Sequence, residues 1–221
     1  MRRFNEIVSH LKDETLVADV GCDHGYISQK LLESGGAKKV VMTDISAKCL
    51  KKAQDLLSNE IANGRATAIV CDGLSGVNLP ITAVVIAGMG GEEIIKILSE
   101  CLDRLPIKKV VLQPMKNADK VREFLVRGKF WLHRDYTFYD ADKYYDLIYA
   151  EKLDGKSDAY SDLDIEFGRE NLLVKSADFI LKYQREIERL NVFLSHENLS
   201  DKSREELVKK INKYKTVIGE L

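Results

Sequence analysis

The residues best suited to chemistry follow a short apolar segment near the N-terminus. Ala18-Asp19-Val20 ends this segment and leads into Gly21-Cys22-Asp23-His24-Gly25-Tyr26, after which the pattern becomes helical. A strand that turns directly into a helix presents unpaired backbone N–H groups to a ligand. Gly21 and Gly25 let the backbone approach that ligand, because neither carries a Cβ. The turn therefore predicts a site for a nucleotide-like cofactor.

The glycine spacing argues against a dinucleotide. A dinucleotide-binding turn has the pattern Gly-x-Gly-x-x-Gly, whereas this chain has Gly21-x-x-x-Gly25 and lacks the middle glycine. Asp19 is also unfavourable beside a phosphate, but it suits a ligand that carries a positive amine. S-adenosylmethionine has an ammonium and a sulfonium group and no phosphate. We therefore expect S-adenosylmethionine as the cofactor.

Two further acids follow later apolar runs in the same way. Asp44 ends Val41-Met42-Thr43, and Asp72 ends Ile69-Val70-Cys71. The carboxyl ends of neighbouring parallel strands face the crevice in which open α/β sheets bind ligands. We expect Asp44 to accept from ribose hydroxyls and Asp72 to accept from an adenine amino group. The alternative, that each acid is only a helix cap or turn former, explains less well why all three follow strands.

The fourth apolar run ends in Ala87-Gly88-Met89-Gly90-Gly91, where an acceptor would lie. An Asn/Asp-Pro-Pro-aromatic motif, used for exocyclic amines, is absent there, and none of the four cysteines is placed as a nucleophile for carbon methylation. The glycines and the flexible Met89 could form a floor against a flat ring. The alternative is an ordinary strand-to-helix turn.

The elements that must position these residues alternate between strand and helix. We expect parallel strands at 16–20, 39–43, 67–71, 83–87 and 110–113, with helices at 1–14, 46–63, 92–102 and 118–127. Ser46 is a good N-cap for the second of these helices. Aromatic-rich strands at 130–139 and 144–152 predict a terminal antiparallel hairpin. This pattern predicts an α/β fold with a Rossmann-like, mostly parallel sheet, as in class I methyltransferases.

The C-terminal part has a different pattern. After a polar connection at 151–164, the chain is expected to be helical from about residue 170, with apolar residues at alternating three- and four-residue steps and a break at 195–203. This predicts a coiled-coil-like helical hairpin, with Ser203-x-x-Glu206 as a capping box. A single helix folded onto the α/β core is the less favoured alternative. We expect a methyltransferase domain at 1–153 and a helical domain at 154–221.

The composition sets broad limits. The 221 residues have a net charge of −1, so any nucleic-acid contact must come from local basic patches. Lys116 and Arg122, just beyond the fifth strand, are the best candidates. No apolar run reaches the ~18 residues of a membrane span, and no signal peptide is evident, so we expect a cytoplasmic protein that does not bind membranes. The scattered cysteines predict neither disulfides nor a metal site.

Several motifs together resemble the bacterial tRNA (adenine-22-N1)-methyltransferase family over nearly the whole chain. They are Asp19-x-Gly21-x-Asp23-His24-x-Tyr26, Asp72-Gly73-Leu74, Ile86-Ala87-Gly88-Met89-Gly90-Gly91, Leu112-Gln113-Pro114 and Val121-Arg122-x-x-Leu125. The C-terminal helical pair also matches. The chain differs at Cys22, where the family usually has Ser, and at Met115, where it usually has Asn.

The resemblance implies methyl transfer from S-adenosylmethionine to N1 of an adenine in tRNA, a reaction that needs positioning more than a strong base. It implies catalytic roles for Asp23, His24 and Met89. The expected cofactor-binding residues are Asp19, Gly21, Cys22, Gly25, Tyr26, Asp44, Ile45, Asp72, Gly73, Ala87 and Gly88. The expected substrate-binding residues are Gly90, Gly91, Gln113, Pro114, Met115, Lys116 and Arg122.

Two other functions stay open at this point. One is a methyltransferase whose acceptor is another nucleic acid or a small molecule. The other is a non-catalytic RNA- or protein-binding module that keeps the cofactor fold. The helical hairpin could contact tRNA through lysines such as Lys209, Lys210 and Lys213, or serve dimerisation, and we expect a monomer or a weak homodimer.

Overall fold

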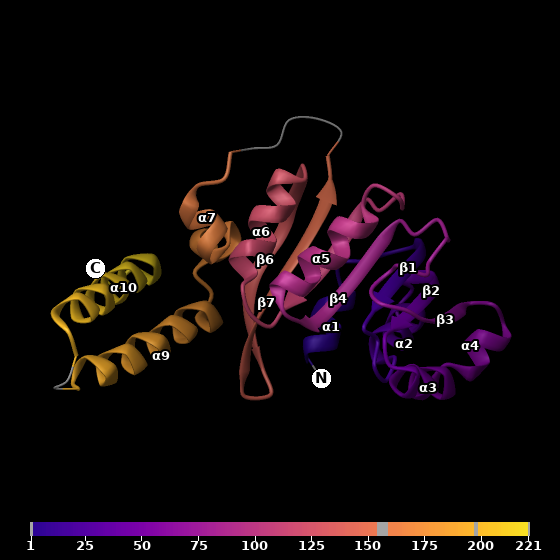
Figure 1. Ribbon diagram of the computed structural model, residues 1–221, viewed down its shortest axis with the longest axis horizontal. Helices are drawn as coiled ribbons and strands as arrows, with labels where there is room; N and C mark the ends of the chain where they lie inside the picture. Colours follow the sequence, from indigo (N-terminus) through magenta and orange to yellow (C-terminus); the bar gives the residue numbers. More distant parts are fainter. Residues whose placement is uncertain (1, 154–158, 197–198, 221) are drawn as a thin grey trace.

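The sheet places β1 between two groups of strands. The computed structural model describes residues 2–153, 159–196 and 199–220, and in it seven strands form one sheet in the order β3-β2-β1-β4-β5-β7-β6 (Figure 1). From β1 the chain adds β2 and β3 on one side and then returns to add β4 on the other. Such a switch point is where open α/β sheets bind ligands. The strands are β1 (Glu14–Val20), β2 (Ala37–Asp44), β3 (Ala66–Val70), β4 (Ala83–Met89), β5 (Lys109–Pro114), β6 (Phe130–Asp140) and β7 (Lys143–Lys152).

The inner strands are parallel, and the helices that connect them cover both faces of the sheet. β1 pairs in parallel with β2 and β4, and β5 pairs in parallel with β4. Val84, Val85 and Ile86, three consecutive residues of β4, are all 0% exposed, as expected of a strand buried on both faces. The register between β4 and β5 shifts between Ala87 and Met89, so β4 is irregular where it reaches the ligand crevice.

The last two strands form the predicted antiparallel hairpin at one end of the sheet. β7 pairs antiparallel with both β5 and β6. The turn residues Ala141 and Asp142 have φ angles of 46° and 62°, which matches the positive φ values of the turns that join twisted antiparallel strands. Because β7 runs opposite to β5, the tip of this hairpin lies at the carboxyl end of the parallel strands.

Two apolar cores lie on opposite faces of the sheet. Ile94 and Val121 bring α5 and α6 onto one face, and Ile7, Leu31 and Leu50 bring α1, α2 and α3 onto the other. The helices of this body are α1 (Arg2–Val8), α2 (Tyr26–Glu33), α3 (Ala47–Leu56), α4 (Ser58–Ala62), α5 (Gly91–Cys101) and α6 (Ala118–Arg127). In the described part of the chain, none of the helices is both long enough and apolar enough to span a membrane.

One predicted helix is interrupted. The segment 46–63 was expected to be continuous, but it divides into α3 and α4 at Leu57, whose backbone leaves the helical region at φ −105° and ψ 25°. Leu57 is 2% exposed, and its side chain packs toward Gly25. Burial of this leucine offsets the local break in the helix. The predicted cap at Ser46 is confirmed, because its side chain accepts from the backbone N–H of Cys49.

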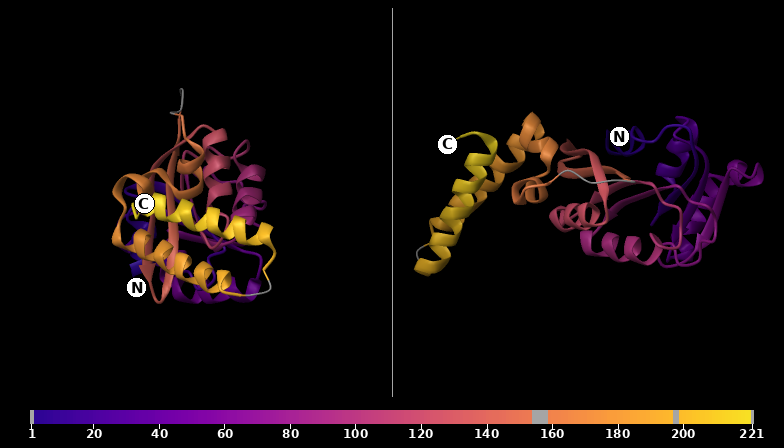
Figure 2. Two further views of the ribbon diagram at one scale, coloured as in Figure 1. Left: turned by 90° about the vertical axis from the view of Figure 1, so that its left-hand side faces the viewer. Right: turned by 90° about the horizontal axis from the view of Figure 1, so that it is seen from above.

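The C-terminal helices have a core of their own and project from the α/β body (Figure 2). Phe179, Leu190 and Ile211 are among the residues that join them. They are α7 (Asp162–Phe167), α8 (Arg169–Val174), α9 (Ala177–Leu194) and α10 (Asp201–Ile218). The predicted domain boundary at 153/154 falls at residues 154–158, outside the described residues, and stays a prediction.

Two details of this region differ from the sequence analysis. Helical structure begins at Asp162 rather than near residue 170, because Ser161 and Asp164 form a capping box there. The predicted box at Ser203 and Glu206 is wrong, because α10 begins earlier. Ser200 is the N-cap, and its side chain accepts from the backbone N–H of Ser203. Ser203 therefore already lies inside the first helical turn.

Candidate active site

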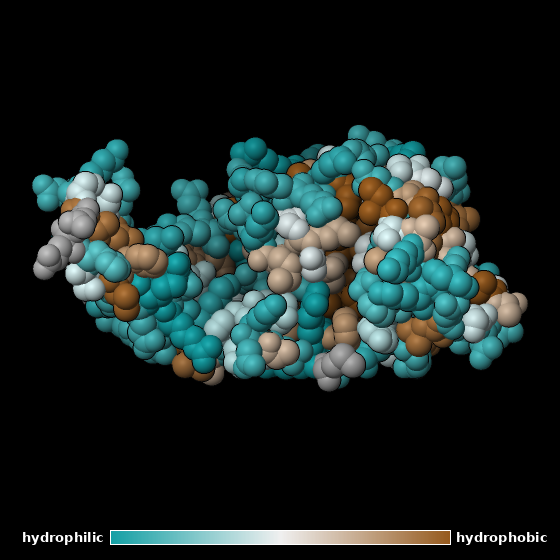
Figure 3. Space-filling view, turned by 60° about the horizontal axis from the view of Figure 1, so that its bottom comes forward, coloured by the Kyte–Doolittle hydropathy of each residue, from teal (hydrophilic) through white to brown (hydrophobic). Residues whose placement is uncertain are grey.

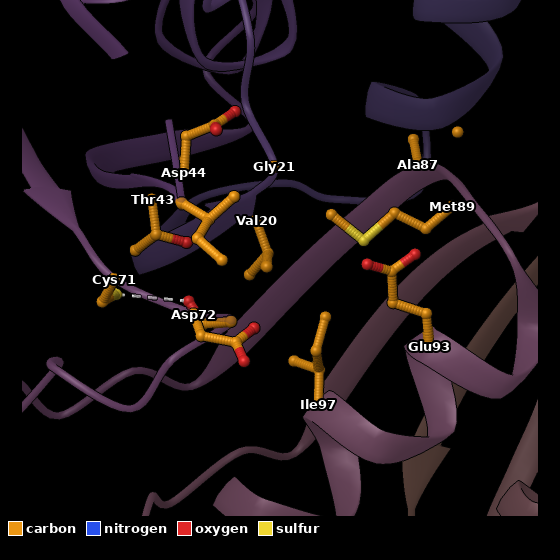
Figure 4. A pocket seen from close by; sticks show the side chains of 13 residues that line it. Val20, Gly21, Thr43, Asp44, Cys71, Asp72, Ala87, Met89, Glu93 and Ile97 are labelled. Carbon is orange, nitrogen blue, oxygen red and sulfur yellow. Dashed lines mark hydrogen bonds between the residues drawn. The ribbon is translucent and has the colours of Figure 1, made fainter. Parts of the chain in front are cut away.

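Two adjoining hollows open at the carboxyl ends of the parallel strands. The first has a volume of about 260 Å³ and lies at the ends of β1 to β4 (Figure 4). The second has a volume of about 380 Å³ and reaches α1. Gly21, Ala87 and Gly88 line both, so the two hollows meet at the switch point between β1 and β4. Their combined size suits a ligand of the size of a nucleoside or small cofactor.

The first hollow collects most residues predicted to bind the adenosine part of a cofactor. Its lining includes Asp44, Ile45, Asp72, Gly73, Ala87 and Gly88. It also includes Val20, Thr43, Cys71, Glu93 and Ile97, which the sequence analysis did not select. Glu93 lies in the first turn of α5 and points toward the hollow beside Met89 (Figure 4). The sequence signal that could have selected Glu93 is its position just after Gly90 and Gly91.

Asp44, at the end of β2, is hydrogen-bonded to the turn that follows β1. Its Oδ1 accepts from the backbone N–H of Ser46 at 2.8 Å, and its Oδ2 accepts from the backbone N–H of Asp23 at 3.2 Å. Gly21 and Cys22 each donate a backbone N–H to the carbonyl of Thr43. These bonds fix the turn after β1 against the end of β2. The carboxylate of Asp44 keeps acceptor capacity, since each oxygen can accept more than one hydrogen bond.

Two observations fit a polar, hydroxyl-bearing ligand in the first hollow. Within the described residues, the buried Oγ1 of Thr43 has no hydrogen-bond partner, and an unpaired buried hydroxyl is unfavourable. Asp72 is exposed and pairs with Lys96 at 3.0 Å. Gly73 has a φ of +56°, and a Cβ there would stand 3.0 Å from the side chain of Ile97. The floor at this point is therefore open because glycine occupies it.

The second hollow combines aromatic and polar groups. The ring of His24 stacks on Tyr26 with centroids 5.6 Å apart and planes within 2°, and Tyr26 lies 6.0 Å from Phe4. The Nδ1 of His24 donates to Asp23 Oδ2 at 2.7 Å, while Lys52 Nζ lies 3.2 Å from its Nε2. These contacts favour the tautomer with hydrogen on Nδ1. The structure thus brings together the predicted residues Asp23, His24 and Tyr26.

At neutral pH the side chain of Asp23 is ionised, whereas the thiol of Cys22 keeps its proton. Burial disfavours the charge of Asp23, but hydrogen bonds from His24 and Cys49 and the charge of Lys52 outweigh it, so the pKa of Asp23 is lowered. Asp23 is therefore a carboxylate at neutral pH. Burial and nearby carboxylates raise the pKa of the Cys22 thiol. A thiol of this kind is a poor nucleophile, which agrees with a site that lacks a covalent step.

Asp19 lies behind the wall of the hollows and is 1% exposed. Its Oδ2 accepts from the backbone N–H and the hydroxyl of Ser28 at 3.1 and 2.7 Å. Burial raises the pKa of Asp19 to about 6, although the bonds from Ser28 oppose this rise. Asp19 therefore anchors the start of α2, and direct pairing with a cofactor amine stays a prediction.

Met89 lines the first hollow and packs against Gly21, which lines both. Its Cε would stand 2.1 Å from a Cβ on Gly21, so the thioether rests directly on the glycine turn. The backbone carbonyl of Met89 accepts from the N–H of Met115 at 2.8 Å. Met89 can therefore contact a ligand in the first hollow where that hollow adjoins the glycine turn.

Two predicted binding glycines have a packing role instead. Gly91 is buried, and a Cβ there would stand 2.4 Å from the carbonyl oxygen of Asn117. Gly25 packs α2 against α3, since its Cβ would stand 2.9 Å from that of Ala53. Neither lines a hollow. Gly90 lies beside the side chain of Lys116, at the exposed edge of the site.

Two other predicted substrate-binding residues, Gln113 and Pro114, are buried. Gln113 is 0% exposed, accepts from Arg3 Nε at 2.8 Å, and donates to the carbonyl of Pro114. Pro114 is also buried, whereas Met115 and Lys116 are exposed. Direct contact of Gln113 and Pro114 with a substrate is therefore contradicted. Their backbone and amide groups instead hold the acceptor edge and the N-terminal helix in place.

Arg122 differs most clearly from the sequence analysis, which expected this residue to bind the substrate. It is 2% exposed, and its Nε donates to both carboxylate oxygens of Asp135 at 2.8 and 3.0 Å. Asp146, nearby, pairs with Lys182 on α9 at 2.9 Å. Burial disfavours the charge of Arg122, but the two acids outweigh it, so its pKa is raised. Arg122 therefore helps to fix the C-terminal helices to the sheet and does not reach a tRNA phosphate.

The comparisons with known proteins agree with this geometry. Residues 17–216 match the family described as tRNA (adenine(22)-N(1))-methyltransferase. The chain belongs to this family. The tRNA (adenine(22)-N(1))-methyltransferase from Bacillus subtilis is 26% identical over 196 residues, which cover 85% of this chain and 81% of the relative.

Two solved structures are similar along almost the whole chain. M. capricolum TrmK in complex with S-adenosyl-homocysteine has a TM-score of 0.88 and 26% identity, covering 99% of this chain and 97% of that one. Streptococcus pneumoniae Sp1610 in complex with S-adenosyl-L-methionine has a TM-score of 0.86 and 26% identity, covering 99% of each chain. The resemblance and the fold class predicted from the motifs are thereby confirmed for this tRNA (adenine(22)-N(1))-methyltransferase family member.

Proposed function

We propose that this chain transfers the methyl group of S-adenosylmethionine to N1 of adenine 22 in tRNA. The observation that carries the proposal is the pair of hollows that meet at Gly21, Ala87 and Gly88 in a chain of this family. One hollow offers acids for a nucleoside. The other offers aromatic rings and a carboxylate beside an exposed edge. A donor and an acceptor can therefore meet over the glycine turn.

The first hollow suits the adenosine of the cofactor. Asp44 would accept from the ribose hydroxyls, and Asp72 from the adenine amino group. Thr43 Oγ1, which has no partner in the described residues, gains a polar neighbour when the hollow is filled. Ile45 is 74% exposed and can cover one face of the adenine. These residues would hold the cofactor by its adenosine part. The sulfonium and its methyl group would then face Met89.

The acceptor chemistry needs little from an acid or a base. When bound, S-adenosylmethionine supplies a methyl group that the N1 lone pair of adenine takes up while the sulfur–carbon electron pair returns to sulfur. Positive charge then moves onto the adenine ring. Asp23, held as a carboxylate by His24 and Lys52, would stabilise this charge. The stacked rings of His24 and Tyr26 would position the flat base, and Met89 would exclude water.

A concave surface beside the site is our candidate path for the tRNA backbone. It lies between the α/β body and the projecting C-terminal helices (Figure 3). A hollow of about 550 Å³ there is lined by both basic and acidic residues, among them Lys143 and Arg185 with Asp142 and Glu186. The guanidinium of Arg185 lies over the rings of two tyrosines of the β-hairpin. Lys116 is also exposed, at the acceptor edge of the site, and is a further candidate for phosphate contact.

The proposed substrate also suggests where and in what form the chain acts. We propose that it acts in the cytoplasm, where it meets tRNA, and that it acts as a monomer or weak homodimer, since one chain supplies both hollows. Light scattering at two protein concentrations tests the second point. A stable, concentration-independent oligomer would contradict it.

Methyl transfer to two matched transcripts tests the proposed function. The purified protein is incubated with tritiated S-adenosylmethionine and either an unmodified tRNA that carries adenine 22 or the same tRNA with guanine 22. We expect 1-methyladenosine, identified by nucleoside analysis, only in the first transcript. Equal label in both transcripts would refute the target position. Label in a nucleoside other than 1-methyladenosine, or none at all, would refute the reaction.

A further inference from the structure

The first turns of α9 face the β6–β7 hairpin through polar side chains. Asp178, Lys182 and Arg185 follow each other at spacings of four and three residues, so they share one face of the helix. Asp178 Oδ2 accepts from the backbone N–H of Tyr139 at 3.1 Å. Lys182 pairs with Asp146 at 2.9 Å. These contacts hold α9 against the hairpin and bring Arg185 to the hairpin tip.

The guanidinium of Arg185 lies over two tyrosine rings at this tip. Tyr139 and Tyr144 are a cross-strand pair whose ring centroids are 4.9 Å apart. The guanidinium carbon lies 5.6 Å from the first ring and 5.4 Å from the second. The hydroxyl of Tyr139 donates to Asp142 Oδ1 at 2.9 Å, which fixes that ring. Arg185 is exposed, so its planar group rests on the rings on one side and keeps the other side open to a further planar group.

The hollow that Arg185 lines is balanced in charge. It has a volume of about 550 Å³, and two lysines and two acids line it as well, namely Lys143, Lys182, Asp142 and Glu186. One of the lysines, Lys182, is already part of an ion pair with the hairpin. Carboxylates are unfavourable beside a phosphate, but they accept hydrogen bonds from the N–H groups on the edge of a base. The hollow therefore suits a nucleobase better than a phosphate.

We propose that Arg185 is a stacking platform for an unpaired nucleobase of the tRNA close to the target adenine. The inference rests on the proposed function, because it takes tRNA as the substrate. The base lies flat on the open side of the guanidinium, and its edge donates to Asp142 or Glu186. Lys143, at the hairpin tip, supplies a cation for the adjoining phosphate.

The platform lies at the same edge of the sheet as the active site. The hairpin tip is at the carboxyl end of the parallel strands, and β7 is two strands from β4 in the sheet. Adjacent strands are about 4.8 Å apart, which gives a separation of about 10 Å. Stacked nucleotides of one strand follow each other at about 3.4 Å, so this distance corresponds to about three nucleotides. The base on Arg185 therefore belongs to a near neighbour of the target and helps to select the position that is methylated.

Equilibrium binding of wild type and Arg185→Ala to matched transcripts tests this inference. One transcript is the complete tRNA. The others carry a single abasic nucleotide, which keeps the sugar and phosphate but lacks the base, at successive positions within about four nucleotides of adenine 22. At one of these positions, loss of the base should weaken binding by wild type about 5- to 100-fold, the range for one stacked base. The same loss should change binding by Arg185→Ala less than about twofold, because that variant has no platform.

Two further variants sharpen the comparison. Arg185→Lys keeps the charge but not the planar group, so it should respond to the abasic transcripts as Arg185→Ala does. Arg127→Ala is the matched control, because Arg127 is an exposed arginine that pairs with Glu123 on its own helix, α6. It should respond as wild type does. Unchanged affinity of each variant for S-adenosylmethionine in calorimetry shows that the variant is folded.

The outcomes separate this inference from the proposed function. If Arg185→Ala weakens binding of complete and abasic transcripts by the same factor, Arg185 holds α9 in place or contacts a phosphate, and the inference is wrong. If none of the abasic positions weakens binding by wild type, the inference is also wrong. Methylation of adenine 22 alongside either result leaves the proposed function intact. If the two losses are coupled but adenine 22 is not methylated, the inference holds and the proposed acceptor fails.

Discussion

Replacing Asp19 by asparagine should stabilise the ligand-free protein, because it removes a charge that burial disfavours. Asp19 is 1% exposed, and burial raises its pKa to about 6 from an ordinary value of 3.8. Its Oδ2 accepts two hydrogen bonds from Ser28. The Oδ1 of asparagine can accept the same bonds, so the substitution changes charge far more than shape.

The size of this effect follows from proton linkage. Because one pKa unit corresponds to about 1.4 kcal/mol, ionised Asp19 destabilises the folded state by about 3 kcal/mol at about pH 7.5. The folded protein holds this proton more tightly than the unfolded chain, so the cost is full above pH 6 and shrinks as the pH falls toward 3.8. At about pH 5 it should be about 1.5 kcal/mol.

Urea unfolding of wild type and Asp19→Asn at these two pH values measures the effect. We expect the variant to be more stable at both, with an advantage that is about 1.5 kcal/mol smaller at the lower pH. Asp55→Asn is a matched control, since Asp55 is exposed and pairs with Lys51 at the surface. An advantage that is absent, or equal at both pH values, would refute the reasoning about burial. If Asp19 also pairs with the cofactor's ammonium, calorimetry should show at least about tenfold weaker binding by the variant.

Three further predictions concern packing and capping. Arg122→Met should destabilise the protein by about 3 kcal/mol or more in urea unfolding, because Asp135 loses the partner of its buried charge; a loss below about 1 kcal/mol would contradict the importance of this pair. Gly91→Ala should lower the melting temperature by several degrees, since its Cβ meets a backbone carbonyl at 2.4 Å, and an unchanged melting temperature would show that the loop moves freely. Ser200→Ala should cost about 1 kcal/mol in unfolding experiments as a lost N-cap, whereas Glu206→Ala should cost little; the reverse order would restore the capping box that the structure contradicts.

The position of the site could be predicted because it depends on where strands end. Apolar runs and their length mark the ends of β1 to β4, and the parallel arrangement brings these ends to one edge. Asp44, Asp72 and Gly88 therefore line one hollow, although 44 positions separate the first from the last in the sequence. The same reasoning could not assign Glu93, whose direction depends on how α5 packs.

The role of Arg122 could not be predicted, since it depends on neighbours far away in the sequence. A basic residue after a strand has the same local pattern whether it faces solvent or a buried acid. Asp135 faces Arg122 only because the register of β6 against β7 shifts between Leu132 and Arg134, which changes the face on which later residues lie. The pair is also covered by the segment around α7, because Arg122 donates to the backbone carbonyls of Ile165 and Glu166. None of these relations has a local signal.

The roles of the glycines in the site likewise depend on neighbours that the local sequence does not reveal. Gly21, Gly25 and Gly91 each need the absence of a Cβ, but the atom that excludes it differs. At Gly91 and Gly25 the nearest atoms belong to the fold itself, a backbone carbonyl and the Cβ of Ala53. At Gly21 the nearest atom is the end of a flexible methionine, which a ligand can displace. A glycine motif therefore predicts that some group lies close to the backbone. The neighbouring atoms in the structure decide whether that group belongs to a ligand or to the protein itself. By this criterion Gly21 and Gly88, the latter beside the end of the Arg3 side chain, are the glycines that the site uses.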